Sequence, residues 1–158
     1  MKHQTIFALL LTLSLLLPVG CGDHDHNHAN HHHSSGSCSD VENLDTYVDG
    51  LEKETAAGHY TVRIKSLSPA PPSKGELTMQ WEIVDKDGMA VSDANLMVRP
   101  FMPAHGHGSS PEDNPGTFED GAYNVGPLTL QMAGHWEFRV SVEGSLQDSA
   151  VFSFCVDG

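Results

Sequence analysis

Positive charge is scarce in this sequence. Eight Lys and Arg residues stand against 21 Asp and Glu residues, and the formal net charge at pH 7 is −13. An acidic surface repels nucleic acid and anionic lipid headgroups. We therefore expect no nucleic-acid partner, and only a weak, unselective attraction for cations.

The sequence motifs of several enzyme classes are missing. There is no Gly-x-Ser-x-Gly elbow, no His-Glu-x-x-His pair and no phosphate-binding loop. The acids at 112–113 and 119–120 lack EF-hand spacing, which favours a solvated acidic loop over a calcium site. A type 1 copper oxidase needs a Cys ligand beside His and Met, and Cys155 is better explained as half of a disulfide. We therefore expect a protein that is not an enzyme.

Only one long hydrophobic run is present, IFALLLTLSLLL at residues 6–17. A basic start precedes it and small residues follow it, as in a secretory signal peptide, and it is shorter than the roughly 20 residues of a membrane-spanning helix. Gly20 before Cys21 resembles the lipobox of bacterial lipoproteins, although Pro18 replaces the usual Leu. We expect residues 1–20 to be a lipoprotein signal peptide. Cys21 would then carry lipid that anchors an exported protein to a membrane of the cell envelope, in the periplasm or at the outer surface.

Cysteines are few, and their number is odd: Cys21, Cys38 and Cys155. Exported proteins usually pair their thiols. If Cys21 is acylated, Cys38 and Cys155 remain, and we expect them to form a disulfide that closes a long loop, worth about 2–4 kcal/mol. The alternative is two unpaired buried thiols.

Residues 21–40 contain no aliphatic side chain larger than Ala29, so we expect a flexible tether without a core. This segment is rich in histidine. Closely spaced imidazoles chelate Zn, Ni or Cu(II), so the tether can collect metal ions, although it can also be a plain polar spacer. Its histidines are His24, His26, His28, His31, His32 and His33.

Residues 41–158 suit one domain with an alternating, period-two pattern of apolar residues. In HWEFRVSVEG, for example, Trp136, Phe138, Val140 and Val142 alternate with polar residues. Six such segments of about eight residues, separated by turn signals, predict an all-β fold, a single small antiparallel β-sandwich. A seventh strand near Tyr47, a short helix or an irregular lead-in all remain open for residues 41–54.

The loop FMPAHGHGSSPED at 101–113 places Met102, His105 and His107 within six positions. QMAGHW repeats the Met-x-x-His spacing with Met132 and His135. Thioether and imidazole ligands together suit Cu(I), because sulfur is soft and binds a monovalent ion without ionising. If the two segments meet at one rim of the sandwich, these five residues form a copper site.

Each candidate ligand also has an ordinary structural explanation. Met102 and Met132 continue the apolar faces of their strands, so both can belong to the core. His135 falls on the polar face of its strand, opposite Trp136, and can be a surface histidine. His105 and His107 are harder to explain without a ligand or binding role, because the flanking glycines already set the backbone of the loop.

Residues 58–156 resemble the YtkA-like domains of bacteria, which are related in pattern to FixH-like proteins. The resemblance is carried by VRPFMPAHGHG and GAYNVGPLTLQMAGHWEFRVSV. Matching positions include Met102, His105, His107, Met132 and Trp136, with Pro103, Gly121, Tyr123 and Gly134. The resemblance implies an exported immunoglobulin-like sandwich associated with copper handling and respiratory oxidase assembly.

Together these features predict an exported, lipid-anchored protein that binds a metal, with Cu(I) favoured, and hands it to a metal-acceptor or oxidase-assembly protein. Exchange of soft ligands at an open rim site suits transfer better than catalysis. The alternative is an adhesion or assembly module without metal, whose 101–116 loop docks a partner protein.

Overall fold

The computed structural model describes residues 38–157. The predicted signal peptide, Cys21 and the six tether histidines lie outside the described residues. Between residues 38 and 157 all regular secondary structure is β-strand. No helix in this part of the chain is long and apolar enough to cross a membrane.

Six long strands carry the fold, as the alternation of the sequence predicted. They are β2 (Tyr60–Ser68), β3 (Gly75–Asp85), β4 (Asn95–Met102), β8 (Ala122–Leu130), β9 (Gly134–Glu143) and β10 (Gln147–Val156). Four short strands join them: β1 (Glu52–Glu54), β5 (His107–Gly108), β6 (Asn114–Pro115) and β7 (Thr117–Glu119). The segment around Tyr47 is an irregular lead-in to β1, not a strand or a helix.

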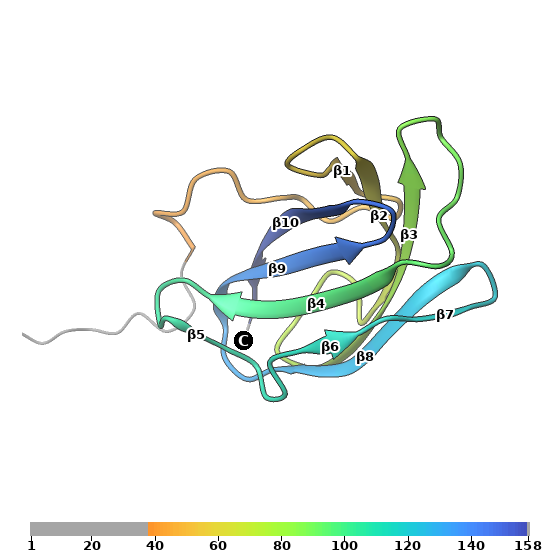
Figure 1. Ribbon diagram of the computed structural model, residues 1–158. Coiled ribbons are helices and arrows are strands. Elements are labelled where there is room, and N and C mark those ends of the chain that lie inside the picture. Colours follow the sequence, from red (N-terminus) through yellow and green to blue (C-terminus); the bar gives the residue numbers. More distant parts are fainter. Residues whose placement is uncertain (1–37, 158) are drawn as a thin grey trace, which may run out of the picture. The chain divides into compact units, whose positions relative to one another are not determined.

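The strands form two antiparallel sheets that pack into a sandwich (Figure 1). One sheet has the order β1-β2-β3-β8-β7. The other has the order β10-β9-β4-β5, with β6 also paired to β4. The predicted all-β sandwich is therefore confirmed.

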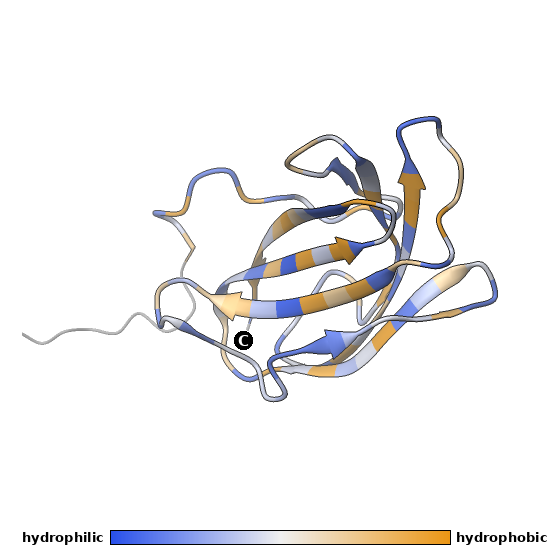
Figure 2. Cartoon of the chain, in the orientation of Figure 1, coloured by the Kyte–Doolittle hydropathy of each residue, from blue (hydrophilic) through white to orange (hydrophobic). Residues whose placement is uncertain are grey.

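The core fills the space between the sheets with the residues that the alternation placed inward. On β9, Trp136 and Phe138 are fully buried, while the alternating Arg139 is exposed. Figure 2 shows this alternation as bands of apolar and polar residues along β4 and β9. Aromatic rings meet across the core, since the ring centroids of Trp81 and Phe152 lie 5.2 Å apart.

The predicted disulfide between Cys38 and Cys155 is present. It ties the lead-in segment to the end of β10. Asp45 fastens the same segment: its backbone N donates to Ser153 O (2.7 Å), and its carboxylate accepts from Ser153 N (2.7 Å). The lead-in therefore follows the free edge of β10 and covers part of it.

Antiparallel pairing sorts the loops onto two ends of the sandwich. Because β4 pairs with β9, the end of β4 lies beside the start of β9 (Figure 1). The turn at 103–106 and the connection at 131–133 therefore share one end, which we call the histidine end. The loop at 86–94 precedes β4 and the turn at 144–146 follows β9, so both lie at the opposite end.

Candidate functional site

A tight hairpin presents the two loop histidines at the histidine end. β4 pairs with β5, with Phe101 opposite Gly108 and Met102 opposite His107. The turn between them closes on one carbonyl, because His105 N (3.1 Å) and Gly106 N (2.9 Å) both donate to Met102 O. Gly106 has φ +67°, in the left-handed region where glycine is favoured. The glycine between the histidines therefore allows the turn that brings them together.

His105 and His107 lie side by side and exposed. Their ring centroids are 5.6 Å apart, and the ring planes differ by 48°. Two imidazoles bound to one ion through N atoms at about 2.0 Å place their centroids roughly 5–6 Å apart, so the spacing suits a shared ion. His107 Nδ1 lies 3.2 Å from Gly108 O. In the tautomer in which Nδ1 donates to this carbonyl, Nε2 keeps a lone pair for a ligand.

Met102 is the last residue of β4, within this hairpin, and is only 2% exposed. Its side chain belongs to the hydrophobic core, as the apolar face of its strand indicated. Residues directly opposite in an antiparallel pair project to the same face, so Met102 and His107 share a face of the sheet. The thioether can reach an ion only from the inner side of the hairpin.

The connection between β8 and β9 brings Met132 to the same end. Met132 is half-buried and packs against the core. Its carbonyl accepts a hydrogen bond of 2.9 Å from Trp136 Nε1, which fixes the connection. Trp136 in turn lies one register step beyond the pair Phe101–Glu137, beside the position of Met102. The two Met-x-x-His segments therefore occupy one end of the sandwich.

His135 does not share the face of Met102. It alternates with the buried Trp136 and projects from the outer side of the sheet, where it lies opposite Cys155 of β10. The residue is half-buried, and its Nε2 is buried without a hydrogen-bond partner. The structure thus pairs His105 with His107, places Met102 and Met132 at the same end, and separates His135 from the face of Met102 and His107.

The loop after the histidines is fastened to β4 by residues that the sequence reading missed. Asn114 is buried, and its Nδ2 donates to Val98 O (3.2 Å) and Glu112 O (3.2 Å). Gly108 lies so close to β4 that a Cβ there would be 2.4 Å from Pro100 O. The only sequence signal for this close approach is the glycine itself. These contacts attach the loop that follows the histidine pair to β4.

His, Cys, Asp and Glu side chains do not form a complete metal site by themselves in residues 38–157. Between residues 38 and 157, no three His, Cys, Asp or Glu side chains lie close enough together to hold one metal ion. A metal bound to the histidine pair would therefore take its further ligands from sulfur, water or a partner.

Comparison with known proteins gives a family for the chain. The sequence matches the YtkA-like family over residues 54–141, more than half of the 158-residue chain. The chain belongs to the YtkA-like family. It matches no curated protein and no solved structure. The family match includes the histidine hairpin and most of β9, and it ends before β10.

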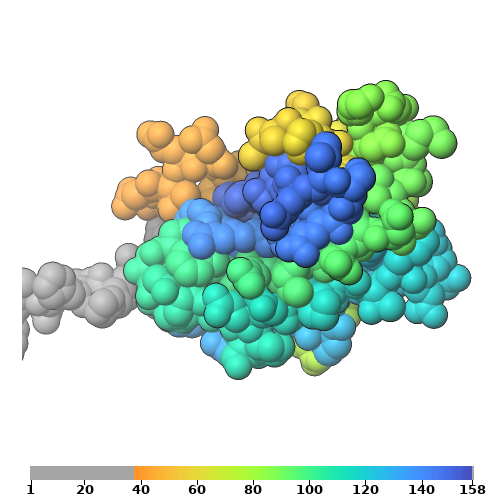
Figure 3. All heavy atoms as spheres, viewed as in Figure 1, coloured from red at the N-terminus to blue at the C-terminus, as the bar shows by residue number. Residues whose placement is uncertain are grey.

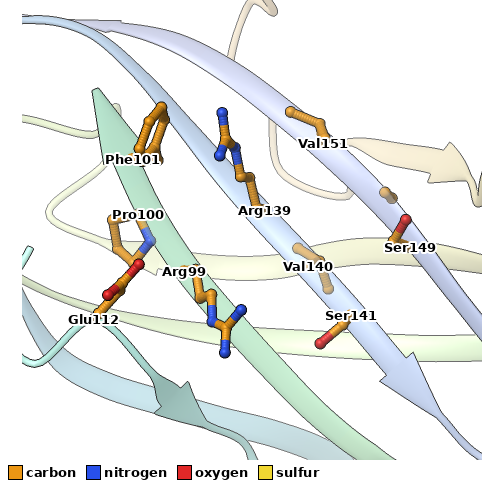
Figure 4. A pocket seen from close by; sticks show the side chains of 10 residues that line it. Arg99, Pro100, Phe101, Glu112, Arg139, Val140, Ser141, Ser149 and Val151 are labelled. Carbon is orange, nitrogen blue, oxygen red and sulfur yellow. The ribbon is translucent and has the colours of Figure 1, made fainter. Parts of the chain in front are cut away.

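The YtkA-like domain also has a groove of about 290 Å³ on the outer face of the sheet that contains β4, β9 and β10 (Figure 4). Arg99 and Arg139 lie opposite each other there, on β4 and β9. Both are already paired. Arg139 stacks over Phe101 (3.7 Å to the ring centroid) and binds Glu137 (2.7 Å).

Arg99 binds Asp113 at the edge of the same groove. Its hydrogen bond lowers the pKa of that carboxyl, which therefore stays ionised. Because these cations are neutralised by neighbouring acids, the groove offers little net charge for an anion. We therefore take the histidine end as the candidate site.

Proposed function

We propose that this YtkA-like protein is an exported, lipid-anchored, non-catalytic protein that binds copper, with Cu(I) favoured, and takes part in metal handling or transfer. The observation that carries the proposal is the exposed pair His105 and His107, with ring centroids 5.6 Å apart on a fastened hairpin. Adjacent imidazoles with open access suit an ion that is received and passed on by ligand exchange.

The ligand chemistry at this end favours copper over harder ions. Imidazole binds several transition metals, but a thioether is a poor ligand for Zn or Mg and a good one for Cu(I). Met102 and Met132 supply thioether side chains at the same end of the sandwich, as the proposed sulfur ligands. No further His, Cys or acid joins the histidine pair in the described residues. The set that can form is therefore two nitrogens with one or two sulfurs.

Two features support an extracytoplasmic place for this chemistry. The Cys38–Cys155 disulfide is typical of an oxidising compartment, and the sequence begins with a signal-like segment ending in Gly20-Cys21. In this proposal the lipid at Cys21 holds the protein at a membrane. The histidine tether collects ions, including Zn or Ni, and a metal-acceptor or oxidase-assembly protein receives the copper.

A competition titration with a Cu(I) chelator under anaerobic conditions tests the proposal. The protein would carry serine in place of all six tether histidines, so that the titration measures Cu(I) binding by the domain alone. We expect one Cu(I) per chain, and a loss of affinity of more than about 100-fold in His105→Ala/His107→Ala, beyond the usual cost of losing an outer-sphere partner. His59→Ala, at the opposite end of the domain, is the matched control and should bind as the parent does.

Absence of binding in the parent would refute the copper proposal. Binding that survives in His105→Ala/His107→Ala would also refute it, because the ion would then be held elsewhere. Absence of binding in the parent favours the alternative, in which the 101–116 loop docks a partner without metal.

A further inference from the structure

We infer that the end of the domain opposite the histidines docks a basic segment of a partner protein that carries an apolar anchoring side chain. This acidic end, as we call it, comprises residues 85–93, 118–121 and 143–146. The inference does not depend on metal binding, because it concerns other residues at the other end of the sandwich.

An apolar groove of about 190 Å³ lies at the acidic end. Its position follows from the sheet: the last residues of β3 that pair with β8 are Gln80 and Trp81, so the end of β3 extends past its neighbour. Only Ala90 bridges to Val84 there. The gap beside the end of β3 is lined by Ile83, Val84, Ala90, Val91 and Phe118, with Glu82 and Gly121.

Large apolar side chains are exposed in the segments of the acidic end. Phe118 is 41% exposed although its ring packs edge-on against Tyr123, and Met89 is 65% exposed. Leu146, on the β9–β10 turn, is 51% exposed. These are three of the five exposed large apolar residues in the described chain. Apolar side chains gathered at one end mark a surface that binds another molecule.

The charge around the groove selects the kind of partner. Lys86 is the only base in the three segments, and it pairs with Asp87 (2.8 Å). The same three segments carry six acids: Asp85, Asp87, Asp93, Glu119, Asp120 and Glu143. These acids do not converge on a metal site, since no group of three suitable ligands exists in residues 38–157. Their negative field favours a partner segment that carries Lys or Arg.

A second, larger hollow of about 630 Å³ extends the surface for a chain segment. It shares Ala90 and Val91 with the apolar groove and continues past Asp93 and Glu143. Figure 3 shows the 85–93 segment and the 117–121 segment adjoining at the right-hand end of the molecule. An extended peptide can thus place one apolar side chain beside Phe118 while its Lys or Arg residues meet the acids.

Other occupants fit this surface less well. A second copy of the chain would bring an equally acidic end against it, and like charges in contact repel. An anionic membrane is repelled for the same reason. A segment of Lys or Arg with one Phe, Leu or Met complements both the charge and the groove.

Amide chemical shifts of the labelled chain (residues 21–158 with Cys21→Ser) test the inference when a probe peptide is added without metal. The probe is a short Lys/Arg-rich peptide with one central phenylalanine. We expect shifts at 85–93 and 117–121 and none at 103–108. Alanine in place of the phenylalanine should weaken binding at least about 5-fold. Raising the salt concentration should weaken binding as well.

Variants of the protein distinguish specific binding at the acidic end from nonspecific attraction to an acidic protein. Asp93→Asn/Glu119→Gln/Asp120→Asn should weaken binding about 10-fold, and Phe118→Ala at least about 5-fold. Met89→Ser supports the same conclusion if Phe118→Ala unfolds. Glu42→Gln/Glu76→Gln/Glu112→Gln removes the same charge from exposed positions elsewhere and should leave binding unchanged.

Four results would overturn the inference: no binding of the probe, shifts centred outside the acidic end, equal loss in both triple variants, or equal binding of the alanine probe. Self-association of the chain through Phe118 in sedimentation equilibrium would also overturn it in favour of a second copy. None of these results bears on copper binding, so failure here is distinct from failure of the proposed function.

Discussion

Met102 and His107 face each other across the β4–β5 hairpin, one fully buried and the other exposed. The pair joins the hydrophobic core to the surface at the point where the two histidines meet. Met102 packs in the core, and it is also the sulfur ligand that the proposed copper site would use beside the two imidazoles. Substitutions at this pair can separate the two roles.

Met102→Leu removes the sulfur while keeping the volume of the side chain. Because core exchanges that conserve volume usually cost less than about 1.5 kcal/mol, the free energy of unfolding should change little. We expect Cu(I) affinity to fall about 10-fold, as a weak but genuine ligand is lost. Met97→Leu, on the outer side of the same strand, is the matched control. An unchanged affinity in Met102→Leu would leave Met132 as the only sulfur ligand to consider.

Gly108→Ala should disturb the hairpin without touching a candidate ligand. The new Cβ would lie 2.4 Å from Pro100 O, so β5 must move away from β4. Overpacking of this kind costs about 1–3 kcal/mol, measurable by urea denaturation, and Cu(I) affinity should fall with it because His107 moves. Ser110→Ala, exposed in the same loop, controls for loop substitution. A variant as stable as the parent would show that the hairpin relaxes freely.

Much of the sandwich was predictable because its long strands each bury one face. Alternation identified Trp136 and Phe138 as core and His135 as outward, and the odd cysteine count identified Cys38 with Cys155. The short strands β5, β6 and β7 were not predictable, since two or three residues cannot show a period. Tyr47 was ambiguous for the same reason.

The candidate site could be predicted only in part. Local spacing identified His105 and His107, whose turn is closed by neighbouring residues. The placement of Met102 and Met132 at the same end of the sandwich depends on the pairing of β4 with β9, two strands that are distant in sequence. The fastening of the loop by Asn114 depends on tertiary contacts, and no periodic pattern reports it.

Asp148 provides the clearest pH dependence. Burial raises the pKa of this carboxyl, but hydrogen bonds from Thr55 Oγ1 and from the backbone N atoms of Ala57, Ser149 and His59 lower it more, and the pKa lies well below its usual range. The unfolded chain therefore takes up the proton first as pH falls. The stability that Asp148 contributes is fully present above about pH 5 and is lost progressively below it.

Asp148→Asn should lower the free energy of unfolding at pH 7 by about 2–3 kcal/mol, the usual worth of hydrogen bonds to a charged group. It should also flatten the fall in stability between pH 5 and pH 2 relative to the parent. Urea denaturation at several pH values measures both effects. Asp87→Asn, exposed at the acidic end, is the control. A parallel pH profile in Asp148→Asn and the parent would contradict this account.

Removal of the disulfide should destabilise the domain. Cys38→Ser/Cys155→Ser opens a loop with a sequence separation of 117, and loss of such a bridge costs about 2–5 kcal/mol. Guanidinium denaturation measures the loss, and hydrogen exchange should rise first at Asp45 and Ser153, where the lead-in meets β10. Cys21→Ser should behave as the parent does. Equal stability with and without the bridge would show that the lead-in docks without it.

X-ray absorption at the copper edge tests the central claim most directly. The sample is the Cu(I)-loaded protein with serine at the six tether histidines. The account predicts one copper per chain bound by two imidazole nitrogens, together with a sulfur shell that weakens in Met102→Leu or Met132→Leu. A spectrum with nitrogen and oxygen neighbours only, or one unchanged in His105→Ala/His107→Ala, would contradict it.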